Sequence, residues 1–225
     1  ESVDLGRFEQ IRIEDYSAVL LADFRAVPGG ISAALERFVL RGGGLWVLAE
    51  TSAVPGSFGD LSRLLPGKLG EAFPQPAASA LKPASAALSL GARWEEFELA
   101  QVEIGRSYPL TPNPGAEIWF ADAGGRPLLA AGSFGRGRVL LFASALDVRW
   151  SNLALKPVFT AFMDAGLRRL TGYTGARSWR GLKIGESIVR VWESGETPSA
   201  KVVVRGPDGR RTAVVVKDRR MEFSD

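Results

Sequence analysis

Six side chains able to hold a ligand follow predicted strands of this 225-residue chain. They are Asp23, Glu50, Asp147, Arg149, Trp150 and Asn152. Carboxylates bind cations and sugar hydroxyls, and arginine pairs with carboxylates through two parallel hydrogen bonds. Tryptophan adds a large flat ring with one polar N–H group. We therefore expect a binding rim where these residues meet, for a partner protein or for a glycan or other small polar ligand.

Each of these residues also has a purely structural interpretation. Trp150 could fill the domain interior, and Asp147 could pair with Arg149 or cap the next element. Asp23 and Glu50 could be solvated carboxylates or helix caps. Residue types and spacing leave both interpretations open.

The chain contains no cysteine and no histidine. This excludes thiolate nucleophiles, disulfides and cysteine-based zinc sites, and it removes the commonest general base and metal ligand. Asp23, Glu50 and Asp147 could still ligate Mg²⁺ or Ca²⁺, or two acids could hydrolyse a glycosidic bond. Nothing in their spacing requires either role, so we expect no catalytic residues, no metal and no cofactor.

Two glycine clusters resemble functional loops only superficially. Gly42-Gly43-Gly44 precedes a predicted strand, whereas a phosphate-binding loop follows a strand and opens a helix. The stretch 132–137 places Ser133 among glycines, but a nucleophile elbow joins a strand to a helix and needs a histidine. We interpret the first cluster as a helix C-cap and the second as a hairpin turn.

A strand–helix–strand unit positions the first two carboxylates. The apolar run at 16–23 fits a strand buried on both faces, and 31–41 carries apolar residues with the spacing of one helix face. Residues 45–49 form a second buried strand, which should run parallel to the first after a right-handed crossover. Asp23 and Glu50 then lie at the carboxyl edge of the sheet, where open α/β folds bind ligands.

The remaining patterns complete an α/β domain over residues 1–175. The predicted elements are a short helix at 59–65, an irregular insertion at 70–87, a strand at 97–104, a hairpin at 117–131, a strand at 138–143 and a helix at 157–170. Asp147, Arg149, Trp150 and Asn152 follow the strand at 138–143, which again places them at a carboxyl end.

Residues 176–225 differ from the preceding domain in their sequence pattern. Three β-branched runs, at 187–192, 200–205 and 212–217, predict a small antiparallel β unit with a turn at Pro207-Asp208-Gly209. Three strands would leave this unit incomplete. The net charge of +3 is too small to indicate nucleic-acid binding.

Seven stretches, taken in order, resemble the extracytoplasmic part of BatA-type (aerotolerance-associated) bacterial membrane proteins. They are Ala18–Asp23, Phe38–Leu45, Phe58–Pro66, Arg126–Leu129, Gly135–Leu141, Leu146–Asn152 and the helix from Phe159 onward. The resemblance covers roughly residues 10–172. It implies a flavodoxin-like, class I glutamine amidotransferase-like domain, with a mostly parallel sheet and helices on both faces. It does not imply amidotransferase activity, because that chemistry needs the cysteine and histidine that this chain lacks.

The resemblance also implies a function and a location. The expected function is a non-catalytic scaffold at the extracytoplasmic (periplasmic) face of the bacterial cytoplasmic membrane. The expected partners are membrane or cell-envelope proteins, and the expected anchors are membrane segments outside this sequence. The alternative is a module that binds glycans or small polar ligands, since amidotransferase-like domains without catalytic residues also occur inside glycosidases, where they serve architecture.

Overall fold

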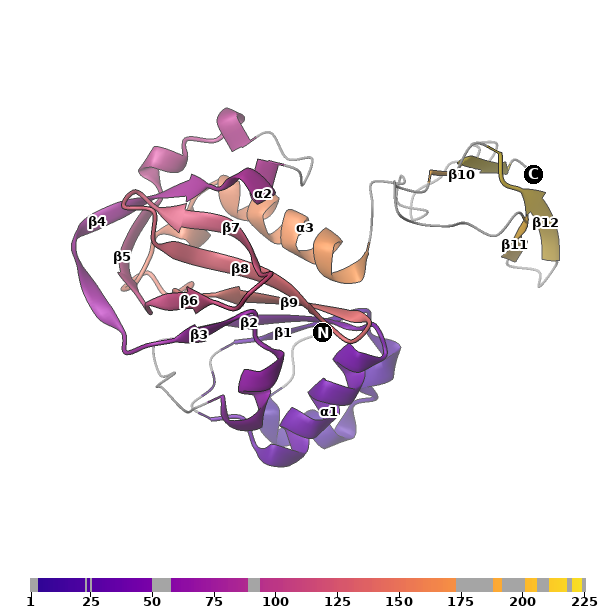
Figure 1. The fold of residues 1–225 in the computed structure, drawn as a ribbon, viewed down its shortest axis with the longest axis horizontal. Coiled ribbons are helices and arrows are strands. Elements are labelled where there is room, and N and C mark those ends of the chain that lie inside the picture. The colour runs from indigo at the N-terminus through magenta and orange to yellow at the C-terminus, as the bar shows by residue number, and fades with distance from the viewer. Residues whose placement is uncertain are drawn as a thin grey trace. The chain divides into compact units, whose positions relative to one another are not determined.

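The computed structural model describes residues 4–22, 24, 26–49, 58–88, 94–172, 188–191, 201–205, 211–217 and 220–223. The chain forms two compact units, Glu1–Gly172 and Tyr173–Asp225 (Figure 1). Within the described ranges, no helix combines the length and the apolar character needed to cross a membrane.

A seven-stranded mixed sheet forms the centre of the first unit, in the order β1-β2-β9-β8-β7-β4-β5. Its strands are β1 (Ala18–Leu21), β2 (Gly44–Leu48), β4 (Phe73–Pro83), β5 (Glu103–Ser107), β7 (Glu117–Asp122), β8 (Pro127–Phe134) and β9 (Gly137–Phe142). β1 pairs with β2 in parallel, as predicted, and β2 pairs with β9 in parallel. The other pairs are antiparallel. The α/β class is therefore confirmed, but the expectation of a mostly parallel sheet is wrong, because tight turns make β7, β8 and β9 antiparallel neighbours.

Two helices cover opposite faces of this sheet: α1 (Gly29–Leu40) and α3 (Val158–Thr171) (Figure 1). Successive strand residues point to opposite faces. Leu45 and Val47 of β2 accordingly belong to the core layer under α1, and Trp46 belongs to the layer under α3. Gly166 of α3 lies so close to the Trp46 ring that an added Cβ would come within 2.2 Å of it.

Shorter elements connect these parts. They are the 3-10 helices η1 (Leu5–Gln10), η2 (Ile13–Asp15), η3 (Gly59–Leu64), η4 (Trp94–Glu96), η5 (Leu99–Gln101) and η6 (Leu153–Leu155), the short helix α2 (Ser85–Leu88), and the strand pair β3 (Gly67–Leu69) and β6 (Leu110–Pro112). The predicted irregular insertion at 70–87 is wrong: β4 occupies most of it and pairs with both β5 and β7. The predicted strand at 97–104 contains η5 instead, and the strand itself starts only at Glu103.

The second unit contains two antiparallel strand pairs. β10 (Ile188–Val191) pairs with β13 (Arg220–Phe223), and β11 (Lys201–Arg205) pairs with β12 (Arg211–Val215). The three predicted strands are thus confirmed, and β13 is an additional one. The predicted turn at 207–209 lies outside the described residues.

Candidate functional site

The segment that links β9 to α3, residues 143–157, carries four of the six predicted site residues. We call it the β9–α3 loop. It starts at the carboxyl end of β9, as predicted, and includes η6. Asp23 and Glu50 lie outside the described residues. The site is therefore built here from Asp147, Arg149, Trp150 and Asn152.

Asp147 and Arg149 form a closed ion pair. The Arg149 guanidinium donates to both carboxylate oxygens, with Nη2 2.5 Å from Oδ2 and Nε 3.0 Å from Oδ1. The Arg149 backbone N–H also donates to Oδ1, at 2.8 Å. The side-chain hydrogen bond from Arg149 is the largest cause that lowers the pKa of Asp147, to about 2. Asp147 is thus an anion at neutral pH, with Arg149 as its partner.

Trp150 lies inside the domain. Its side chain is only 6% exposed and packs on Tyr108, with ring centroids 5.1 Å apart. Its backbone carbonyl accepts hydrogen bonds from the N–H groups of Gly105 and Arg106, at 2.7 and 3.1 Å. A ring buried in this way cannot offer a face to a sugar, so the expected stacking surface is corrected to a packing role.

Asn152 links the loop to residues 101–103 of the same polypeptide. Its Oδ1 accepts a hydrogen bond from the Glu103 N–H at 2.8 Å, and its Nδ2 donates to the Gln101 carbonyl at 3.1 Å. Ser151 donates its hydroxyl to the Ala145 carbonyl at 2.8 Å, which closes the loop on itself. Because these groups already have partners, Asn152 is occupied in positioning the loop.

The loop nevertheless exposes apolar side chains. Val148 is 64% exposed and Leu155 is 71% exposed. The side chain of Arg149, which follows Val148 in the sequence, is exposed as well. A loop whose polar groups bond internally loses little hydration when another surface covers it. The exposure of Val148 and Leu155 was not predicted from the sequence, because two apolar residues in a polar segment form no distinctive pattern.

Chemically, this site offers a carboxylate, a guanidinium group and apolar side chains, but no thiolate or imidazole. The full sequence has no cysteine or histidine. Within the part of the chain that the structure describes, no cluster of three or more His, Cys, Asp or Glu side chains is arranged to hold a metal.

A buried carboxylate that sequence reasoning missed lies at the β7–β8 turn. The Asp122 side chain is fully buried and accepts from the N–H groups of Gly124 and Arg126, both at 2.9 Å, and from Nε of Arg126 at 2.6 Å. These bonds shape a tight turn, so Asp122 has a structural role. The two glycines that follow it two and three residues later are the pattern that could have revealed this role.

Comparisons with known proteins give the fold alone. No protein-family model matches the chain, and no curated protein matches it in sequence. Among solved structures, it is similar to the cytoplasmic protein STM3548 from Salmonella typhimurium, with 13% identity over 70% of this chain and 73% of that one and a TM-score of 0.59. It is also similar to the cytoplasmic protein STM1381 from the same organism, with 15% identity, coverage of 68% and 69%, and a TM-score of 0.50.

The chain also resembles part of much larger enzymes. A β-galactosidase from Rahnella sp. R3 matches 94% of this chain with 16% identity and a TM-score of 0.54. The match covers 31% of the enzyme. At this identity the likeness concerns architecture and assigns no activity.

Proposed function

We propose that this chain is a non-catalytic interaction module of a membrane-anchored bacterial protein of the BatA type, exposed on the extracytoplasmic face of the membrane. It binds a membrane or cell-envelope protein through the β9–α3 loop. The observation that carries the proposal is a loop with internally bonded polar groups that holds Val148 and Leu155 in solvent. Fully burying a side chain of this size contributes about 1.5–3 kcal/mol.

The flavodoxin-like, amidotransferase-like assignment belongs to this proposal. Support comes from the parallel strands β1, β2 and β9, with α1 and α3 on opposite faces. The absence of cysteine and histidine from the whole sequence supports a domain of that shape without its chemistry. The match to about a third of a large β-galactosidase is compatible with an architectural role.

A carboxylate-only hydrolase receives no support from the loop. A glycosidase acid must carry a proton near neutral pH, which needs a raised pKa. The Arg149 pairing instead lowers the pKa of Asp147 to about 2. The glycan-binding alternative loses two of its residues, because Trp150 is buried and the amide of Asn152 is occupied.

The test is site-specific crosslinking in intact membranes. A photoreactive amino acid replaces Val148 in the full-length protein, and a second version carries it at Leu167, an apolar residue on α3 that is 37% exposed. We expect position 148 to capture one defined envelope or membrane protein, and position 167 not to capture it. Equal capture from both positions, or none from position 148, would refute the proposal.

A further inference from the structure

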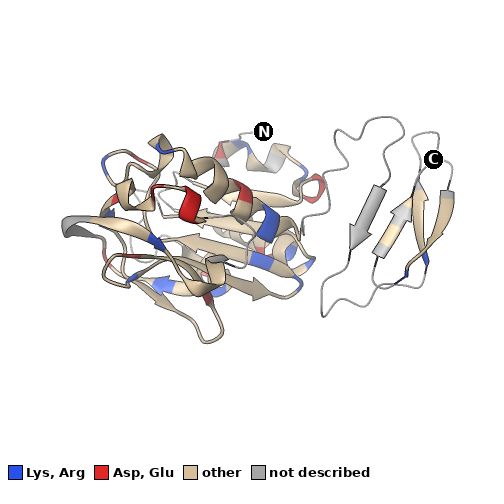
Figure 2. Ribbon diagram, turned by 90° about the horizontal axis from the view of Figure 1, so that it is seen from above, with Lys and Arg blue, Asp and Glu red and all other residues tan. Residues whose placement is uncertain are grey.

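A pocket of about 470 Å³ lies at the edge of the sheet opposite the β9–α3 loop, where β2 begins. Its polar lining comes from Glu14, Tyr16, Ser17, Arg37, Arg41 and Thr171. The C-terminal ends of α1 and α3 and the β8–β9 turn meet at this end of the first unit, and several segments with Lys or Arg residues lie there (Figures 1 and 2). Segments distant in sequence thus line one pocket, which holds two arginines and one glutamate.

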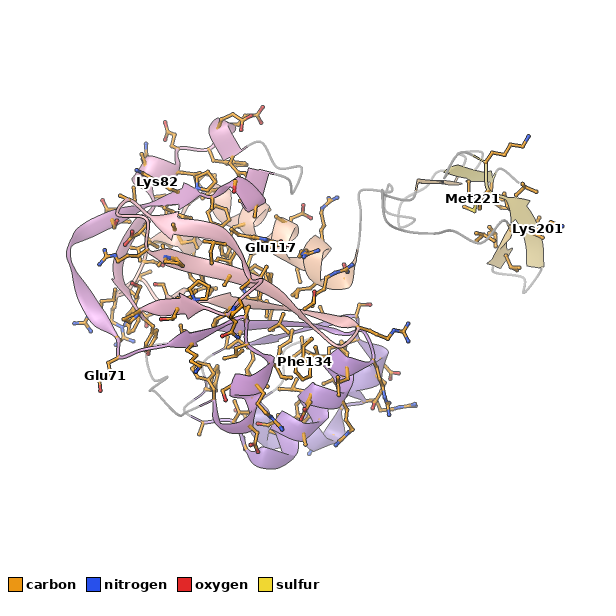
Figure 3. All side chains as sticks on the ribbon, in the orientation of Figure 1. Glu71, Lys82, Glu117, Phe134, Lys201 and Met221 are labelled. Carbon is orange, nitrogen blue, oxygen red and sulfur yellow. The ribbon has the colours of Figure 1, made fainter. Side chains whose placement is uncertain are left out.

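Arg37 and Arg41 line the pocket from the last turn of α1 and the residue that follows it. They are four residues apart, so both project from one side of α1. Within the described ranges neither side chain has an ion pair or hydrogen bond. By contrast, Arg169 of α3 lies 3.2 Å from Glu117, the β7 residue labelled in Figure 3.

The C-terminal end of α1 explains only in part why Arg37 and Arg41 lie together. A cation in the last turn of a helix interacts favourably with the partial negative charge there. Two cations at this spacing also repel each other by a few tenths of a kcal/mol. A bound anion would remove that repulsion and would satisfy donors that are otherwise only hydrated.

The glycines at the end of α1 contribute no backbone donors to the pocket. The N–H groups of Gly42, Gly43 and Gly44 already bond to the carbonyls of Val39, Phe38 and Ser17, at 2.9, 3.0 and 3.0 Å. This confirms the glycine cluster as a helix end rather than a phosphate-binding loop. The Thr171 hydroxyl donates to the Leu167 carbonyl at 2.9 Å. The side-chain donors left for a ligand are the two guanidinium groups and the hydroxyl of Ser17.

We propose that this pocket binds the phosphate group of a hydroxylated molecule. Two guanidinium groups match the charge of a phosphate monoester, which is close to −2 at neutral pH, better than the single charge of a carboxylate. Ser17 supplies a third donor. The Glu14 carboxylate in the same lining disfavours a second anion and accepts a hydrogen bond from a ligand hydroxyl. This site is independent of the partner surface on the β9–α3 loop.

Two probes distinguish the source of the phosphate. The 225-residue chain is titrated calorimetrically with glycerol 3-phosphate at low ionic strength, and it is sedimented with phosphatidylcholine vesicles that contain phosphatidic acid. Saturable binding of the soluble probe indicates a small phosphorylated metabolite. Binding to the vesicles alone indicates a lipid headgroup. Either result supports the phosphate chemistry, and binding of neither probe overturns it.

Matched variants test the residues. Arg37→Gln/Arg41→Gln should weaken binding at least about tenfold, because it removes charge-assisted hydrogen bonds. Arg7→Gln/Arg106→Gln removes the same charge from two exposed arginines outside the pocket lining and should change affinity by less than about threefold. Equal weakening by both double variants would show that only net charge matters and would overturn the proposal. Thermal unfolding confirms that each variant is folded.

Discussion

Replacing Trp150 by alanine should destabilise the first unit strongly. The indole is 6% exposed and packs on Tyr108 at 5.1 Å, within the core layer under α1. Truncating a buried tryptophan costs about 3–5 kcal/mol, including about 0.5–1.5 kcal/mol for an aromatic pair. In a chain of this size 1 kcal/mol moves the unfolding midpoint by about 2–4 °C, so the expected drop is about 6–20 °C.

The assay is thermal and urea unfolding of the 225-residue chain, followed by near-ultraviolet circular dichroism. Val148→Ala is the matched control, because Val148 lies two residues away and is 64% exposed. It should stay within about 0.5 kcal/mol of the parent chain. If Trp150→Ala also stayed within about 1 kcal/mol, the ring would not be a core element, and a ligand-stacking role for it would have to be restored.

Three further outcomes follow from single contacts. Gly166→Ala should destabilise the protein by about 1–3 kcal/mol in urea unfolding, because its Cβ would come within 2.2 Å of the Trp46 ring; no change would mean that α3 packs differently. Asp122→Asn should cost about 1.5–3 kcal/mol by the same measurement, since it weakens charge-assisted hydrogen bonds in a buried turn; a neutral result would contradict that geometry. The pKa of Asp147, followed by carboxyl NMR, should be about 2, and in Arg149→Gln it should return toward 3.8. Because the folded-state pKa is lowered, the ion pair contributes to the stability of the fold above pH 3.8, and this contribution is lost as the pH falls through about 2. Identical titration of Asp147 in the parent chain and in Arg149→Gln would refute the pairing.

The strand–helix–strand unit could be predicted because its information is local. The apolar run of β1, the helical spacing in α1 and the continuous apolar residues of β2 each lie within one short segment. Burial on both faces requires such a continuous run, and β2 is buried along its whole length. β1 is instead the edge strand of the sheet and leaves Leu20 38% exposed, so the prediction of a strand buried on both faces is wrong for β1. The hairpin of β7 and β8 was similarly predictable from the turn between two β-rich runs.

β4 could not be predicted from its own residues. Its segment is rich in alanine and proline, which have low strand propensity. It is a strand because β5 and β7 pair with it on either side, and those pairings join distant parts of the chain. The two antiparallel pairs that β4 makes escaped prediction for this reason, whereas the β7–β8 and β8–β9 pairs form across short turns.

The sequence predicted the place of the candidate site and left two roles open for its residues, and for Trp150 and the Asp147–Arg149 pair the structure shows the structural role. The carboxyl end of β9 was correctly chosen, since Asp147 to Asn152 follow that strand directly. Whether Trp150 faced solvent depended on Tyr108, which arrives from a distant part of the chain. The internal bonds of Asn152 likewise depend on Gln101 and Glu103, so its role follows only from the folded structure.

Partner retention by loop variants tests the central claim most directly. The membrane-anchored protein that we propose is purified in detergent as the parent, as Val148→Asp/Leu155→Asp and as Leu167→Asp. The amount of the crosslinked partner that co-purifies with each is then quantified. A charge buried against a partner is costly, so the loop variant should lose at least about nine-tenths of that protein while Leu167→Asp retains it. Full retention by the loop variant would contradict the assignment of the β9–α3 loop as the docking surface.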